Sequence, residues 1–155
     1  MEGIVFSECD MHISYLAGIF DGEGCISVMY SKRGSQWYIP LAQVSMYCQE
    51  IVEMFADMYG GKVQEEHPNY IWRVTGDDLK VFCTQLKSFV KFKKRHLEIA
   101  LELLDTFGGL RGRYMTKEVL NRRRILVDEL RKLQLKGPLV HTDAVDRVND
   151  YPGSI

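Results

Sequence analysis

The amino-acid sequence predicts an α+β fold. The expected architecture is an αββαββα core, in which a four-stranded antiparallel, saddle-shaped sheet carries helices on one face, followed by extra C-terminal helices. Two pairs of segments alternate apolar and polar residues around short turns, and segments of helical periodicity precede, separate and follow them. A length of 155 residues with 46% hydrophobic residues suits one domain with a substantial core. We therefore expect one domain over residues 1–137 and a C-terminal tail over 138–155.

The first helix and the first hairpin come before residue 47. Ser7 or Asp10 can cap a helix that runs to about Phe20. Residues 25–31 then alternate, and a turn at 32–35 leads to a returning strand over 37–46.

The second half of the core repeats this order. A helix over 49–59 ends at Gly60-Gly61, and strands over 62–66 and 70–75 flank a turn at 67–69. Asp77 is expected to cap a helix that reaches about Ser88.

Two further helices follow the core. One covers 94–107, with four inward residues: Leu97, Ala100, Leu101 and Leu104. The other begins at the cap Thr116 and ends near Leu135, before Gly137-Pro138.

Composition excludes several classes of protein. No apolar run approaches the roughly 18 residues of a membrane span, and the N-terminus does not resemble a signal peptide. The four cysteines lack CxxC spacing, so neither a zinc site nor a disulfide framework is indicated. We expect reduced thiols and a location in the cytoplasm, or in an organelle matrix if the gene is organellar.

Charge is distributed unevenly although its sum is small. The net charge is −1 and the pI is about 6.4, which does not by itself indicate nucleic-acid binding. Residues 87–95 nevertheless carry five cations and no acid, and residues 111–124 contain a second basic cluster. Such clusters fit either a phosphate-facing surface or solvated helix faces.

The end of the first helix has the most unusual chemistry. Asp21 and Glu23 follow its apolar run, where the helix already presents about half a negative charge. Carboxylate and carbonyl oxygens at this point could hold a divalent metal. Gly18 and Gly22 lie on one helical face, so two copies of the helix could pack closely. The alternative is an ordinary core helix with a glycine cap and two solvated acids.

Residues 16–24 resemble the motif of the LAGLIDADG homing endonucleases. Five positions are identical, Glu23 is an acid in place of an acid, and Gly22 stands where the motif has alanine; the identical residues are Leu16, Ala17, Gly18, Asp21 and Gly24. The resemblance continues to about Phe107, through Val44–Met46, the Gly60-Gly61 turn, Tyr70–Gly76 and Phe89–Lys93.

The resemblance implies a metal-dependent DNA endonuclease. Its catalytic residues would be Glu23, Lys93 and Asp21, with Glu23 and the Gly22 carbonyl binding Mg²⁺ or Mn²⁺ and Ca²⁺ as a non-catalytic occupant. Lys93 would lie near the attacking water, and Asp21 would have a mainly structural role.

A single motif per chain implies a homodimer and a long, palindromic or near-palindromic duplex target. The predicted interface consists of Leu16, Ala17, Gly18, Phe20, Asp21 and Gly22.

The face of the sheet away from the helices is predicted to read the DNA major groove. The expected contacts are Ser27, Met29, Ser31, Lys32, Arg33, Gln36, Tyr38, Gln43, Lys62, Gln64, Glu66, Ile71 and Arg73.

One departure from the family pattern leaves alternatives open. Met46 stands where the family usually has Gln or Asn near the metal-site water, and methionine cannot donate a hydrogen bond. Gln43 or Gln49 could compensate if the strand register shifted. The alternatives to an active enzyme are a cleavage-impaired DNA-binding regulator, an RNA-binding maturase, and a small α+β ligand-binding or scaffold domain with a chance motif.

Overall fold

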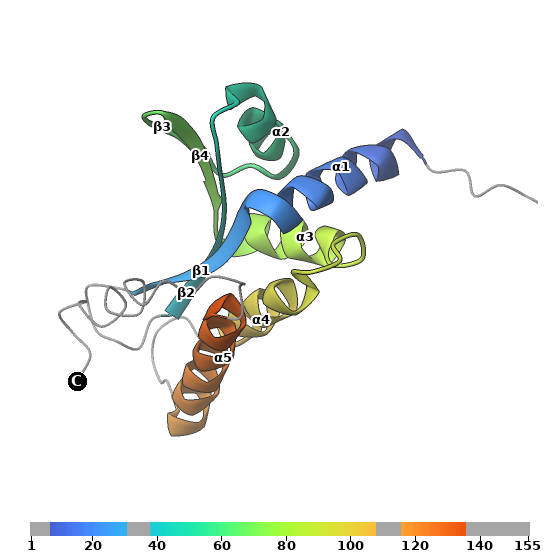
Figure 1. Ribbon diagram of the computed structural model, residues 1–155. Helices are drawn as coiled ribbons and strands as arrows, with labels where there is room; N and C mark the ends of the chain where they lie inside the picture. The colour runs from blue at the N-terminus through green and yellow to red at the C-terminus, as the bar shows by residue number, and fades with distance from the viewer. Residues whose placement is uncertain (1–6, 31–37, 108–115, 136–155) are drawn as a thin grey trace, which may run out of the picture.

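The structure, a computed structural model, describes residues 7–30, 38–107 and 116–135 (Figure 1). The elements are α1 (Glu8–Glu23), β1 (Gly24–Tyr30), β2 (Tyr38–Met46), α2 (Gln49–Tyr59), β3 (Lys62–Glu66), β4 (Asn69–Val74), α3 (Gly76–Leu86), α4 (Lys94–Asp105) and α5 (Lys117–Leu135). The expected turn at 32–35, the predicted contacts Ser31, Lys32, Arg33 and Gln36, and the tail over 138–155 lie outside the described residues.

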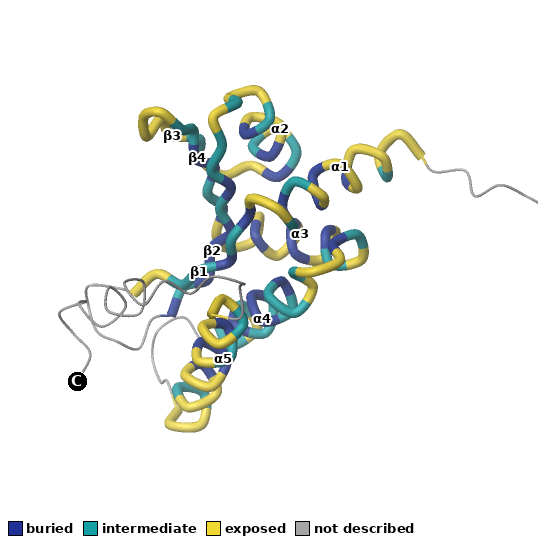
Figure 2. Tube along the Cα trace, viewed as in Figure 1, coloured by how far each residue is buried: buried dark blue, intermediate teal, exposed yellow. Residues whose placement is uncertain are grey.

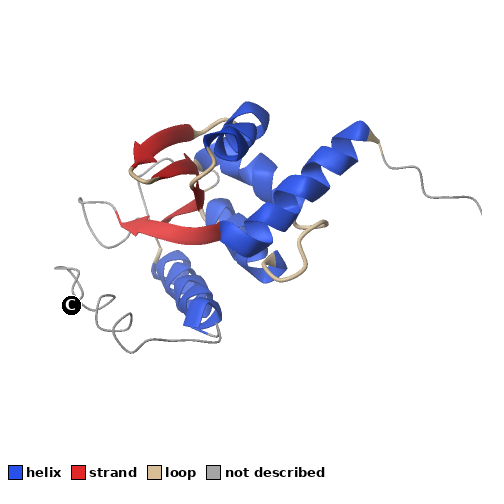
Figure 3. Ribbon diagram, turned by 45° about the horizontal axis from the view of Figure 1, so that its top comes forward, coloured by secondary structure: helices blue, strands red, loops and turns tan. Residues whose placement is uncertain are grey.

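The four strands form one antiparallel sheet in the order β1-β2-β4-β3. Each hairpin contributes neighbouring strands, and β2 joins the hairpins by pairing Gln43 with Arg73. Helices pack against one face of the strands (Figure 3). This arrangement confirms the predicted α+β fold and its antiparallel sheet.

The core lies between the sheet and the helices. Its largest fully buried side chains include Trp72 from β4 and three phenylalanines from the helices, namely Phe20, Phe55 and Phe82. The Phe82 ring centroid lies 5.1 Å from both Phe20 and Trp72. Figure 2 shows buried residues along the strands and on the inward sides of the helices. Because each aromatic ring removes a large apolar area from water, this cluster fixes α1 and α3 against the sheet.

The helix α1 is longer than the sequence indicated. Ser7 and Asp10, each predicted as a possible cap, together form a reciprocal capping box at its start. Its end is at Glu23 instead of Phe20, and the cap residue Gly24 has extended backbone angles of φ −81° and ψ 157°. The two acids therefore belong to the last helical turn. The side chain of Lys93, from a later segment of the chain, binds carbonyls at this helix end and offsets part of their negative charge.

Two other expectations about the helices were wrong in detail. The N-cap of α3 is Thr75, and Asp77 lies in the first turn, where a carboxylate still favours the helix N-terminus. On α4, Leu97 and Ala100 are fully buried as expected, and Leu101 and Leu104 are partly buried and pack against the core. Ile99 and Leu103, which were not expected to face inward, are also fully buried. The difference arises because α4 packs against both α3 and α5, so its buried stripe is wide.

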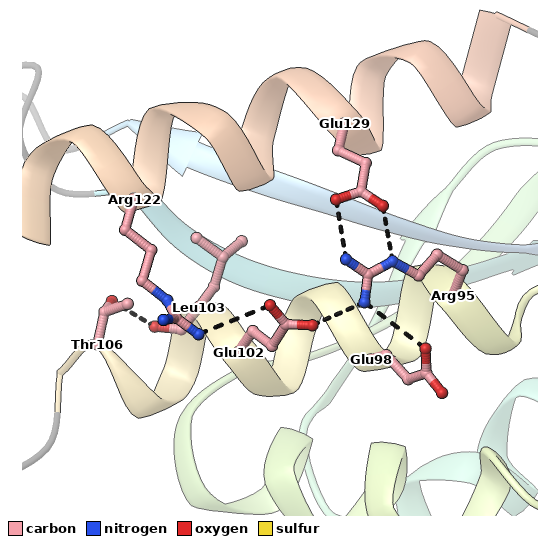
Figure 4. A network of polar contacts seen from close by, with 7 residues as sticks. All are labelled: Arg95, Glu98, Glu102, Leu103, Thr106, Arg122 and Glu129. Carbon is pink, nitrogen blue, oxygen red and sulfur yellow. Dashed lines mark hydrogen bonds and ion pairs between the residues drawn. The ribbon is translucent and has the colours of Figure 1, made fainter.

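The helix α5 lies beside α4 and begins at its predicted cap, where the Thr116 hydroxyl accepts the Val119 N–H. Arg95 of α4 donates from Nε and Nη2 to the two carboxylate oxygens of Glu129, at 2.7 and 2.8 Å (Figure 4). Near the other end, Gln134 donates to the Ile26 carbonyl at 2.7 Å, on the edge strand β1. Thus α5 connects the start of α4 with the exposed edge of the sheet.

The turn between α2 and β3 depends on glycine. Gly60 and Gly61 have φ angles of 71° and 84°, which L side chains rarely adopt. A Cβ atom on Gly61 would lie 2.4 Å from the Arg73 carbonyl oxygen. Within the three described ranges, no helix combines the length and apolar character needed to cross a membrane.

Candidate functional site at the end of α1

The last turn of α1 meets the segment between α3 and α4. Asp21 accepts the backbone N–H groups of Lys91, Phe92 and Lys93 at 2.7, 3.2 and 3.1 Å. These donors lie about 70 residues further along the chain, immediately before α4 begins at Lys94. Asp21 therefore holds the backbone of residues 91–93 in place, and this contact is structural.

Lys93 binds the same helix end through its side chain. Its Nζ donates to the carbonyl of Phe20 at 3.0 Å and also to the carbonyl of Gly24. The ammonium lies 5.6 Å from the centroid of the Phe20 ring. Carbonyls at a helix C-terminus favour a nearby cation, so Lys93 compensates part of the negative charge that gathers there. Positive charge was expected at this point, and the chain itself supplies some of it.

The surroundings of Lys93 are partly dry. Burial lowers the pKa of Lys93, while the nearby Cys25 thiol and the Asp21 and Glu23 carboxylates act in the opposite direction. Burial raises the pKa of Cys25, against the effect of Lys93. Burial and the Lys93 charge together lower the pKa of His96, whose Nδ1 is buried and has no hydrogen-bond partner among the described residues.

Cys25 and His96 were not predicted as neighbours of the site. His96 lies three residues after Lys93 on α4, and Cys25 follows Gly24 on β1, so proximity to the motif was a weak signal for each. Nothing in the sequence indicated that α4 would turn His96 toward the end of α1.

Glu23 has a different environment from Asp21. Its side chain is exposed, and no hydrogen bond or ion pair joins it to another described residue. Gly22 is also exposed. The described residues contain no group of three or more acids, cysteines or histidines that could hold a metal. A single chain thus offers one carboxylate and one carbonyl to a hard cation, which is a partial set of oxygen ligands.

The outer side of α1 differs from the predicted interface. Leu16, Ala17 and Phe20 are at most 1% exposed, because they pack into the chain's own core. Their side chains cannot reach a second subunit, so their assignment to an interface was wrong. Asp21 is held by the turn before α4, as described above.

The two glycines do fit a close helix contact. A Cβ atom added at Gly18 or Gly22 would find no atom within 4 Å. The same side of α1 exposes Met11 and Tyr15, at 56% and 50%. The open stripe on α1 therefore consists of Met11, Tyr15, Gly18 and Gly22.

The open face of the sheet carries most of the predicted DNA contacts. The register places Gln43, Arg73 and Lys62 in one row across β2, β4 and β3. Ile71 and Gln64 form the adjacent row with Ser45. Ser27 and Met29 on β1 have the same orientation, because they alternate with the core residues Ile26 and Val28.

Tyr38 does not belong to this face. It pairs with Tyr30, is 9% exposed, and packs edge-to-face against the Tyr30 ring at 5.3 Å. Its position on β2 matches the inward residues Ala42 and Val44, so the predicted DNA contact was wrong.

Met46 lies at the end of β2, opposite Tyr70, and packs against the core. Neither glutamine compensates for it: Gln43 accepts from Arg73 Nε at 3.3 Å, and Gln49 donates to Glu53 on α2 at 2.7 Å. The β2–β4 register pairs Gln43 with Arg73 and Met46 with Tyr70, so neither glutamine takes the place of Met46.

Solved structures provide a comparison for this geometry. The archaeal intron-encoded homing endonuclease I-Vdi141I, complexed with DNA, aligns with a TM-score of 0.70 at 21% identity over 92% of this chain and 99% of its own. The homing endonuclease I-CvuI, in complex with the I-CreI target in the presence of 2 mM Mg and with the DNA not cleaved, aligns with a TM-score of 0.70 at 15% identity over 91% of this chain and 96% of its own.

A longer protein matches over half its length. The LAGLIDADG meganuclease I-AabMI, bound to uncleaved DNA, aligns with a TM-score of 0.61 at 18% identity over 92% of this chain and 50% of its own. No protein-family model matches the chain, and a search of the curated proteins finds no match. At these identities the comparison establishes a shared fold: the chain has the fold of the LAGLIDADG homing endonucleases, as its motif implied.

Proposed function

We propose that this chain is a site-specific, divalent-metal-dependent DNA endonuclease that cuts both strands of a long, near-palindromic target as a homodimer. The observation that carries the proposal is the pair of acids at the end of α1. Asp21 is fully engaged in holding the Lys93 segment, whereas Glu23, two residues away, projects an unpaired carboxylate from the described part of the chain. The fold shared with DNA-bound homing endonucleases supports the same proposal.

The available donors fit a hard cation. Glu23 and the Gly22 carbonyl would hold Mg²⁺ or Mn²⁺, and Ca²⁺ would occupy the same oxygens without supporting cleavage. A bound divalent ion would supply a more acidic water and would stabilise negative charge on the attacked phosphate.

The chain's own residues prepare the surroundings of that phosphate. Lys93 uses two of its three N–H donors on the Phe20 and Gly24 carbonyls, so one donor remains for an approaching phosphate or water. Asp21 fixes the Lys93 backbone, so the ammonium does not have to be ordered when DNA binds. Such preorganisation contributes to catalysis because charge is stabilised without rearrangement.

The second copy of the chain would complete the site. Gly18 and Gly22 are exposed and leave room for a second α1 to approach. Two helices that cross at a two-fold axis would bring two Glu23 carboxylates together, and DNA phosphates would supply further oxygens.

Cleavage of a defined plasmid tests the proposal. The plasmid carries the two sequences that flank the gene, joined without the gene, because mobile endonucleases usually cut the uninterrupted version of their own locus. We expect linear product in Mg²⁺ with the wild type, none with Glu23→Gln, and normal cleavage with Asp57→Asn, an exposed acid on α2 that matches the charge change. Equal cleavage by wild type and Glu23→Gln would contradict the proposed role of Glu23.

A second candidate function is a cleavage-impaired DNA-binding regulator. Its support is Met46, which cannot donate a hydrogen bond and whose possible substitutes, Gln43 and Gln49, are engaged elsewhere. Tight duplex binding without nicking, by both the wild type and Glu23→Gln, would favour this regulator. Preferential binding to a folded intron RNA over duplex DNA would instead indicate the maturase.

A further inference from the structure

Arg73 is the centre of a polar cluster on the open face of the sheet. Its guanidinium donates hydrogen bonds to side-chain oxygens on two other strands: Gln43 of β2 at 3.3 Å, and Gln64 and Glu66 of β3 at 3.0 and 3.1 Å. The Arg73 side chain is 36% exposed. Three acceptors on one guanidinium restrict its rotamers, so Arg73 is held in a defined position before any ligand arrives.

The contact with Glu66 occupies the end of the guanidinium. Both Nη1 and Nη2 donate to the same oxygen, Glu66 Oε1, at 3.1 Å. Nε is engaged by Gln43 on the other side of the group. The paired N–H groups at this end are also the ones that a guanidinium uses when it binds two neighbouring acceptors end-on.

Glu66 is the only carboxylate on the open face of the described strands. Among the described strand residues, the other charges on this face are Arg73 and Lys62, both positive. A duplex approaching the sheet presents phosphates and base acceptors, which attract the two cations and repel Glu66. The position of the one acid, on the fork of the central arginine, therefore affects how the face meets DNA.

We propose that Arg73 selects a guanine in the major groove of the target and that Glu66 occupies the arginine fork until guanine replaces it. This inference rests on the proposed DNA-binding function and assigns a base preference to one residue of that surface. Guanine O6 and N7 are two adjacent acceptors that match the fork, and no other base offers this pair in the major groove. A base without it leaves the displaced carboxylate uncompensated, so Glu66 adds selectivity by opposing the other three bases.

Magnitudes favour the exchange only for guanine. A partly exposed ion pair changes an equilibrium constant by at most about fivefold. A bidentate arginine–guanine contact discriminates against a wrong base by about five- to 150-fold. Guanine can therefore displace Glu66 with a net gain, whereas adenine, cytosine and thymine cannot.

Binding selection from a randomised duplex library tests the proposal without a known target. The full chain is incubated with the library in Ca²⁺, and bound duplexes are sequenced. We expect wild type to enrich a guanine at one position of each half-site, and Arg73→Ala to lose about tenfold or more of that preference. Arg73→Lys keeps the charge but lacks the fork, and it should lose the preference with less loss of overall affinity.

Two further variants separate the roles of charge and fork. Glu66→Gln should bind all sequences several-fold more tightly and discriminate less against the other bases at the same position. Lys62→Ala, in the same row of the sheet, should weaken binding about equally for all sequences. Unfolding temperatures of every variant show whether the sheet is intact.

The outcomes distinguish this inference from the function on which it rests. An unchanged guanine preference in folded Arg73→Ala or Arg73→Lys, while wild type enriches a defined sequence, would overturn the role of Arg73 and leave DNA binding established. Weaker binding by Glu66→Gln would overturn the competition and make Glu66 a support for the arginine. A wild-type chain that enriches no duplex would overturn both the proposed function and this inference.

Discussion

The two acids at the end of α1 should have separable roles, which the variants Asp21→Asn and Glu23→Gln test directly. Asp21 accepts three backbone N–H groups from residues 91–93. A hydrogen bond to a charged acceptor contributes about 1.5–3 kcal/mol. Asparagine keeps one acceptor oxygen for the Phe92 and Lys93 N–H groups but turns its NH₂ group toward the Lys91 N–H, so that hydrogen bond is lost.

A second effect opposes the loss. Removing a negative charge from a helix C-terminus is favourable by about 0.3–1 kcal/mol. With one such bond lost and the dipole gain subtracted, Asp21→Asn should lower the free energy of unfolding by about 0.5–2.7 kcal/mol. For a chain of this size that corresponds to a decrease of about 1–11 °C in the unfolding temperature.

Thermal unfolding followed by circular dichroism, without DNA and without metal, measures this change. Glu23→Gln is the matched control, because Glu23 is exposed at the same helix end and pairs with no described residue. Because this change also removes a negative charge from the helix C-terminus, it should leave the free energy of unfolding equal to that of wild type or up to about 1 kcal/mol higher, while abolishing cleavage. If Asp21→Asn unfolded within about 1 °C of wild type, the three hydrogen bonds would not hold the Lys93 segment, and the reasoning would fail.

Three further predictions concern the rest of the chain. Gly18→Leu, at a position with no atom within 4 Å of an added Cβ, should leave the unfolding temperature intact and give only monomer by sedimentation; a retained dimer would rule out the α1 contact. A double-mutant cycle between Arg95 and Glu129 should give a coupling energy of about 1 kcal/mol, since the pair is over a third exposed. Burial raises the pKa of Cys83 from 9.0 to about 12, so the folded chain holds a proton that the unfolded chain releases above pH 9. Stability should fall there by about 1.4 kcal/mol per pH unit more than in Cys83→Ala, as urea titrations at successive pH values would reveal.

The order of the elements was predictable because local signals determined it. Alternation over residues 25–30 reflects one buried and one open face, and the register of Ile26 with Ala42 gives that pattern a physical basis. Helix caps at Ser7 and Thr116 act within three residues, so the sequence contains everything that they require. The limits of β3 followed from the Gly60-Gly61 turn for the same reason.

The sequence predicted several residues of the candidate site but not the contacts between them. Nothing local indicates that Asp21 receives three N–H groups from a segment about 70 residues away, or that Lys93 reaches back to the Phe20 carbonyl. The same limit explains the wrong interface residues. Leu16, Ala17 and Phe20 belong to the motif, but their periodicity could not distinguish packing in the chain's own core from packing against a second chain.

Lys93 changes the electrostatic argument that first drew attention to the motif. Two acids at a helix C-terminus require positive charge, and the ammonium of Lys93 meets part of that requirement at the carbonyls of Phe20 and Gly24. Asp21 is satisfied separately by the backbone of the same segment. Within the described residues, Glu23 is then the acid of this helix end that remains without a bonded partner. A divalent ion is thus not needed to stabilise the fold, and its proposed place narrows to the one carboxylate that folding leaves free. Metal binding should therefore depend on Glu23 and a second copy of the chain, and the isolated monomer should keep its fold in the presence of a chelator.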